Sequence, residues 1–142
     1  MKRPLYVSTG ALVGRVNGYD LGGALGIIAD LYGRGSCRGL ELMMLPAYYG
    51  RRDEVISLVR DCGVPAPVIH CDKDVGTLLS DAGTLYAAGK SEDADGKRDE
   101  GLRLFRLNCA FGESLSIPRM VLHLWGGYAS DHHVDYNVSM LP

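Results

Sequence analysis

The chain has 142 residues, of which 46% are hydrophobic and 23% are charged, and its formal net charge is −2. This size and composition suit one globular domain with a hydrophobic core, and they exclude a chain-wide basic surface for nucleic acid. No apolar run reaches about 18 residues, so we predict no membrane span. The apolar stretch after Met1 to Pro4 is too short for a signal peptide, and we therefore predict a cytoplasmic protein.

Short apolar strands alternate with helical patterns along the chain. Asp20 is suited to cap a helix in which apolar residues recur at helical spacing as far as Tyr32. A second helix is expected to start with Asp53 as its N-cap and to end at Gly63. The predicted strands span residues 5–9, 40–45, 67–71 and 120–124.

Three further segments separate the third strand from the fourth. We expect one short helical turn over residues 74–80, an exposed loop over the polar residues 90–100, and a longer helix from Leu102 to Phe111. The resulting order is β-α-β-α-β-α-β, which implies a parallel sheet with right-handed crossovers. We predict that the four strands lie in the order 1-2-3-4.

Two histidines occupy matching places in the third and fourth strands. His70 and His123 each follow two apolar residues. The carboxyl ends of parallel strands meet at one edge of the sheet, where α/β proteins bind ligands, so we expect both imidazoles at that edge. A buried histidine is also common as a satisfied core residue, and both interpretations stay open. As ligands, neutral imidazoles suit zinc, manganese or iron.

Other polar residues are expected near the same edge. Glu41 lies within the second strand, where a carboxylate is costly unless it is paired or acts on a ligand, so it is either a catalytic candidate or an ion-pair partner. Asp72 and Lys73 directly follow the third strand and are either groups that orient a ligand or ordinary loop charges. Ser8 and Thr9 end the first strand and give a weaker signal.

The polar segment after the fourth strand supplies candidate substrate-binding residues. Trp125 precedes a Gly-Gly turn and is suited to form an apolar wall for a sugar ring, or simply packs at the rim. Asp131 and His133 belong to a segment rich in possible ligands, which either folds over the site or is a solvated loop.

Four motifs carry a family resemblance when they are taken in order. They are Ser8-Thr9-Gly10, Gly39-Leu40-Glu41-Leu42, Val68-Ile69-His70 and Val121-Leu122-His123. The ordered set resembles the first half of a xylose-isomerase-like TIM barrel, the superfamily of sugar phosphate isomerases and epimerases and of endonuclease IV. The resemblance covers residues 5–142 and implies that His70 and His123 are metal ligands.

The resemblance also implies a fold and a function. A full barrel has about 250 residues, so residues 1–142 are expected to form one α/β domain of four β-α units, about half of a (β/α)8 barrel. The family's other metal ligands come from later strands, which makes the site for Zn, Mn or Mg incomplete in this chain. The implied enzyme is a divalent-metal-dependent sugar isomerase or epimerase acting on a sugar or sugar phosphate. A homodimer or a C-terminal half would complete it.

Two alternatives stay open. Tyr48, Tyr49, Arg51 and Arg52 follow the second strand and suit a nuclease of the endonuclease IV type, the one alternative under which nucleic acid is a partner. Against it, Leu124 follows His123 where that branch usually has a proline or a small polar residue. The other alternative is an inactive half-barrel fragment without a complete site.

Overall fold

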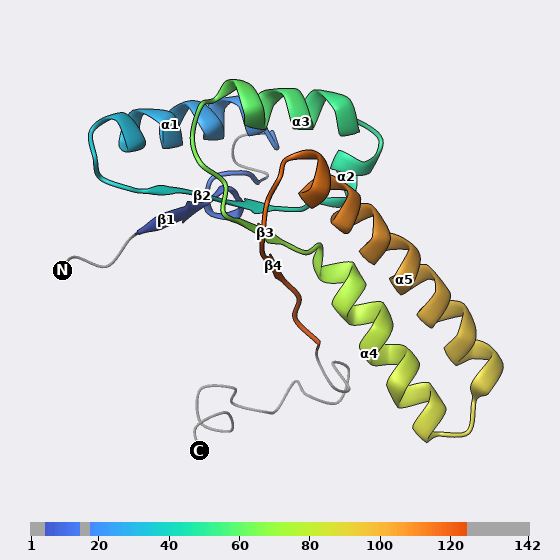
Figure 1. Cartoon of the computed structure of the whole chain (residues 1–142). Helices are drawn as coiled ribbons and strands as arrows, with labels where there is room; N and C mark the ends of the chain where they lie inside the picture. The colour runs from blue at the N-terminus through green and yellow to red at the C-terminus, as the bar shows by residue number, and fades with distance from the viewer. Residues whose placement is uncertain (1–4, 15–17, 125–142) are drawn as a thin grey trace, which may run out of the picture. The chain divides into compact units, whose positions relative to one another are not determined.

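The computed structural model describes residues 5–14 and 18–124. The candidate substrate-binding residues Trp125, Asp131 and His133 therefore lie outside the described residues. The described chain divides into two compact units (Figure 1). We call the described part of residues 1–72 and 105–122 the sheet unit, and that of residues 73–104 and 123–142 the hairpin unit. None of the described helices is long and apolar enough to cross a membrane.

The sheet unit holds four parallel strands in the order β1-β2-β3-β4, which confirms the predicted order and direction. The strands are shorter than predicted, because β4 pairs with β3 at two positions only and β3 itself ends at His70. The prediction that His123 lies inside the fourth strand is therefore wrong. The bounds are β1 Tyr6–Ser8, β2 Gly39–Met43, β3 Val68–His70 and β4 Met120–Val121.

Side chains alternate between the two faces of this sheet, as successive residues of a strand must. Leu40, Leu42 and Ile69 are at most 1% exposed and belong to the hydrophobic core. Glu41 and His70 alternate with them and are partly exposed. We call the face that carries Glu41 and His70 the open face.

The longer helices of the sheet unit pack on the other face and contribute to the same core cluster, whereas Gly10 of the 3-10 helix after β1 lies against the Met43 side chain on the open face. The helix α1 (Leu21–Gly33) lies beside α3 (Arg52–Asp61), above the strands in Figure 1. Arg52 of α3 donates to the Ser114 hydroxyl at the end of α5 (Ser91–Ser114), which joins these two helices. The short helix α2 (Pro46–Tyr49) and the 3-10 helix η1 (Thr9–Ala11) follow β2 and β1.

Local signals set most of these helix ends. Asp20 caps α1 by accepting a hydrogen bond of 3.0 Å from the Gly23 amide, as predicted. Gly63 follows α3 with a φ of +67°, a conformation that favours glycine, also as predicted. The N-cap of α3 is Arg51 instead of Asp53. Asp53 lies in the first turn, where its charge is favourable at the positive end of the helix dipole.

The hairpin unit corrects two predictions. The helix α4 spans Lys73–Ala87 and is much longer than the single turn predicted for residues 74–80. The expected loop over residues 90–100 is helical, because α5 starts at Ser91. Its charged residues pair at helical spacing, with Arg98 2.6 Å from Asp95, and such pairs support an exposed helix. Polar composition alone therefore does not distinguish this helix from a loop.

Candidate functional site

Glu41 and His70 lie on the open face of neighbouring strands. In the β2–β3 register Glu41 pairs with Val68 and Met43 pairs with His70. Paired residues of parallel strands point to the same face, so the carboxylate and the imidazole are diagonal neighbours on the open face. Among the described residues the structure gives Glu41 no ion pair. The arrangement brings a candidate acid–base group and a candidate ligand to one surface.

The hydroxyls at the end of β1 have different surroundings. Ser8 pairs with Glu41 in the sheet register and so shares the open face with it. Its Oγ atom is buried and has no hydrogen-bond partner among the described atoms, a state that costs about 1–3 kcal/mol. The Thr9 hydroxyl accepts a hydrogen bond of 2.9 Å from the Met43 amide. Thr9 therefore stabilises the end of the strand, whereas Ser8 adds a polar atom beside Glu41.

The imidazole of His70 is oriented by the backbone that follows it. Its Nδ1 lies 3.2 Å from the carbonyl oxygen of Cys71. A carbonyl oxygen only accepts, so this hydrogen bond places the proton on Nδ1 and the lone pair on Nε2. Metal-bound histidines commonly have this pattern, in which the second ring nitrogen donates to a carbonyl or carboxylate. The His70 environment therefore fits a ligand role.

A buried polar network lies directly beyond His70. Asp72 is 2% exposed and Asn108 is fully buried. The Tyr49 hydroxyl donates to Asp72 Oδ2 over 3.1 Å and accepts from Asn108 Nδ2 over 2.8 Å. The Asp72 amide in turn donates to Asn108 Oδ1 over 3.2 Å. The network joins the ends of β2 and β3 to α5, and it shows that Asp72 is no ordinary loop charge.

The same region holds two groups whose ionisation is suppressed. Burial raises the pKa of the Tyr49 hydroxyl well above its ordinary value, and Asp72 adds to the shift. Burial likewise raises the pKa of the Cys71 thiol to about 12, again with a contribution from Asp72. Both groups therefore stay neutral around pH 7, and the tyrosine acts as a hydrogen-bond donor and acceptor instead of a base.

The network was not predicted from the sequence, although one signal points to it. Leu104 and Phe111 are buried positions of α5, and Asn108 lies between them at helical spacing. A polar residue at an apolar position of an amphipathic helix must find hydrogen bonds inside the protein. Its partners are 36 and 59 residues away in sequence, so no local pattern identifies them.

The second predicted metal ligand, His123, belongs to the hairpin unit. It lies two residues beyond β4 and is exposed, as is Lys73, the first residue of α4. Within residues 5–14 and 18–124, no group of three or more His, Cys, Asp or Glu side chains is placed to hold a metal ion. A shared metal site of His70 and His123 stays a prediction.

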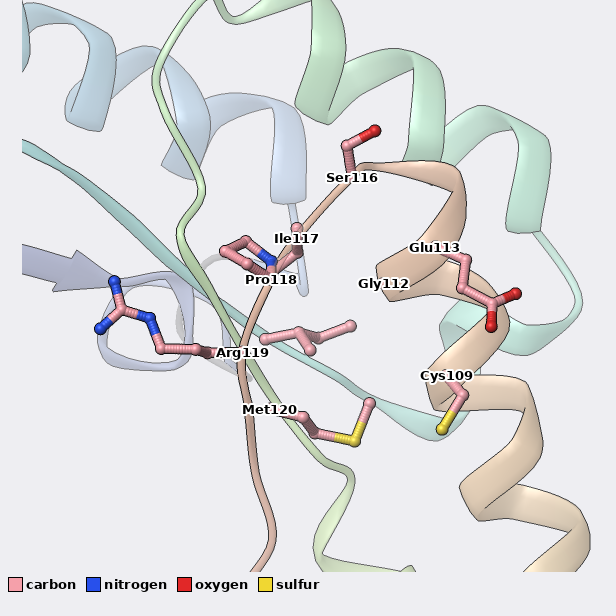
Figure 2. A pocket seen from close by; sticks show the side chains of 9 residues that line it. Cys109, Gly112, Glu113, Ser116, Ile117, Pro118, Arg119 and Met120 are labelled. Atoms are coloured by element: carbon pink, nitrogen blue, oxygen red, sulfur yellow. The ribbon is translucent and has the colours of Figure 1, made fainter.

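A groove of about 330 Å³ opens elsewhere in the sheet unit (Figure 2). It lies between the end of α5 and the start of β4, and the side chains of Cys109 and Met120 face each other across it. Ile69 also lines it, which places the groove on the helix-covered face. The groove is therefore separate from the open face that carries Glu41 and His70.

Comparison of the chain with models of protein families, with curated proteins and with solved structures gives no match. The resemblance to the xylose-isomerase-like barrels stays a prediction, and the function has to be argued from the arrangement of Glu41 and His70.

Proposed function

We propose that this chain forms about half of a (β/α)8 TIM barrel of the xylose-isomerase-like type and works as a divalent-metal-dependent sugar isomerase or epimerase. The observation that carries the proposal is the sequential parallel order β1-β2-β3-β4 with α1, α3 and the end of α5 packed on one face. A doubly wound sheet reverses its strand order and places helices on both faces, whereas a barrel does neither.

The open face corresponds to the barrel interior in this proposal. His70 is the last paired position of β3, at the carboxyl end of the strand, which is the end where TIM-barrel enzymes place their active sites. His70 and His123 would hold the metal ion, and Glu41 is the candidate catalytic carboxylate of this chain. When bound, Zn, Mn or Mg would polarise the hydroxy-carbonyl group of a sugar or sugar phosphate.

The donor set that this chain offers fits such an ion only in part. Imidazole and carboxylate are suitable ligands, but stable sites generally use three or four protein ligands. His70 and His123 supply two, and Glu41 is kept as the candidate catalytic group. The remaining ligands would come from a C-terminal half or a second copy of the chain, so we expect metal binding by this chain to be weak.

The nuclease alternative loses the support that its sequence signal gave. Of the four residues that suggested contact with DNA, Tyr48 is 2% exposed and the Tyr49 hydroxyl is bonded to Asp72. Arg51 and Arg52 each form hydrogen bonds to other residues of the sheet unit. The two tyrosines are therefore part of the fold, the two arginines stay half-exposed, and we keep sugar chemistry as the proposal.

Titration of the isotope-labelled chain with Mn²⁺, followed by nuclear magnetic resonance, tests the proposal. The paramagnetic ion should broaden the signals of His70 and Glu41. We expect a dissociation constant of tens of micromolar or weaker, which corresponds to a binding free energy of about 6 kcal/mol at most. The variant His70→Ala should abolish the broadening. Glu113→Gln removes a carboxylate of the groove on the other face and serves as the matched control. Absence of broadening at both residues up to millimolar Mn²⁺ would favour the inactive fragment.

Activity separates the isomerase from the nuclease. With Mn²⁺, Mg²⁺ or Zn²⁺ present, a panel of keto-sugars and sugar phosphates should show slow isomerisation or epimerisation that Glu41→Gln abolishes. A duplex containing an abasic site should stay intact under the same conditions. Metal-dependent cleavage of that duplex without turnover of any sugar would replace this proposal by the nuclease.

A further inference from the structure

One peptide group connects the His70 imidazole to the buried side chain of Asn108. The carbonyl oxygen of Cys71 accepts from His70 Nδ1, and the N–H of the same peptide, which belongs to Asp72, donates to Asn108 Oδ1. Both heavy-atom distances are 3.2 Å. Because a trans peptide is planar, its C=O and N–H point in opposite directions. The bond to Asn108 therefore also directs the carbonyl oxygen toward His70.

The orientation of the Asn108 amide is itself determined by its partners. Its Nδ2 donates to the Tyr49 hydroxyl, which in turn donates to the Asp72 carboxylate. A flipped amide would place an NH₂ group against the Asp72 N–H, so that two donors would meet in a buried position. The ring of Tyr49, Asn108 and Asp72 thus has one consistent set of hydrogen-bond directions.

From this chain of contacts we infer that Asn108, supported by Tyr49 and Asp72, is a positioning residue that fixes His70 in its Nδ1–H tautomer. The functional meaning of this tautomer rests on the proposed function, because it directs the Nε2 lone pair to a metal ion or a polar substrate. In water a neutral histidine side chain populates mainly its Nε2–H tautomer. The network therefore selects the minor tautomer before any ligand arrives.

The preceding peptide group, between His70 and Cys71, has its own anchors in the sheet. The His70 carbonyl accepts from the Met44 amide, and the Cys71 amide donates to the Val121 carbonyl, each over 2.9 Å. These bonds do not involve Asn108. A variant at position 108 should therefore keep the end of β3 in the sheet and lose only the bond that orients the 71–72 peptide.

Long-range ¹H–¹⁵N correlation of the histidine rings measures the tautomer directly in the metal-free chain. The variant His70→Gln identifies the His70 signals. The wild type should show the Nδ1–H pattern. Asn108→Leu, which has nearly the same shape and no polar atoms, should shift most of the population toward Nε2–H.

Phe111→Leu is the matched control, because it removes buried volume from the same helix without touching the network. It should lower stability and leave the tautomer unchanged. If Asn108→Leu fails to fold, Tyr49→Phe takes its place and should lower the Nδ1–H population part of the way. A wild-type His70 in the Nε2–H form, or an unchanged tautomer in folded Asn108→Leu, overturns the inference. Neither result depends on metal binding or turnover, so a failure of this inference can be distinguished from a failure of the proposed function.

Discussion

Arg52 of α3 donates from Nη2 to the Ser114 hydroxyl of α5 over 2.6 Å, and its guanidinium lies 5.9 Å from the centre of the Phe111 ring. This contact makes α3 and α5 neighbours on the helix-covered face, just as α1 and α3 are neighbours there. In a (β/α)8 barrel, the helices that connect successive strands likewise lie next to one another on one face of the sheet.

The Arg52 contact should make a measurable contribution to the free energy of unfolding. We expect Arg52→Ala to lower the free energy of unfolding by about 1 kcal/mol, because it loses a charged hydrogen bond and a cation–π contact at a half-exposed site. Arg34→Ala is the control, since Arg34 forms an exposed ion pair with Asp30 and its loss should cost at most about 0.5 kcal/mol. Equal losses in urea unfolding would show that Arg52 contributes no more than a surface charge.

Replacing either of two glycines in α5 by alanine should have opposite effects on stability. A Cβ atom at Gly101 would lie 2.9 Å from Leu79 Cδ2 and 3.2 Å from Leu78 Cβ in α4, whereas at Gly96 it would meet nothing within 4 Å. Gly96→Ala should therefore stabilise the helix by about 0.5–1 kcal/mol through propensity alone. Gly101→Ala should gain nothing or lose about 1 kcal/mol, because α4 has to move away. Thermal unfolding followed by circular dichroism compares the pair, and an equal gain at both sites would contradict the packing.

The sequence predicted the elements whose signals are local. Asp20 and Gly63 mark helix ends through chemistry that acts over a few residues. The helix that begins at Ser91 was missed because its stabilising partners are charges, which are equally common in loops.

The sequence singles out individual candidate residues, whereas the network around them could not be predicted from it. Glu41 stood out as a carboxylate inside an apolar strand, and His70 as a polar residue at a strand end. The bonds among Tyr49, Asp72 and Asn108 join residues between 23 and 59 positions apart. These residues come into contact only when α2, β3 and α5 pack together, so the network follows from tertiary structure.

The raised pKa of Cys71 predicts a loss of stability in alkali. Well below the ordinary cysteine pKa of about 8.5 the thiol is neutral in both the folded and the unfolded chain. As the pH rises further, the unfolded thiol ionises while the folded one, with a pKa of about 12, stays neutral, so the free energy of unfolding falls. Tyr49, whose pKa is also raised, acts in the same direction at higher pH.

Urea unfolding at several values between pH 8 and pH 10.5 checks this sign. The free energy of unfolding should fall more steeply with pH for the wild type than for Cys71→Ala. The difference in slope should correspond to the release of up to about one proton per molecule, since only the wild type releases the thiol proton on unfolding. Arg34→Ala, which leaves the thiol in place, should keep the wild-type decline. Parallel curves for the wild type and Cys71→Ala would show that the folded thiol ionises normally.

The open face and the β1 edge predict self-association or binding of a completing half. Leu5 is 61% exposed and Tyr6 is 40% exposed at that edge, and an apolar edge strand pairs readily with another chain. We expect light scattering at micromolar concentration to show a homodimer instead of a monomer, unless a separate C-terminal half is added. Tyr6→Lys should weaken the association at least tenfold, because it places a charge on the open face beside the edge.

Tyr32→Lys is the matched control: Tyr32 is 38% exposed on α1, on the helix-covered side, and its replacement should leave association unchanged. A wild-type monomer of 15.4 kDa with cooperative unfolding would contradict the half-barrel and indicate a self-contained α/β sheet.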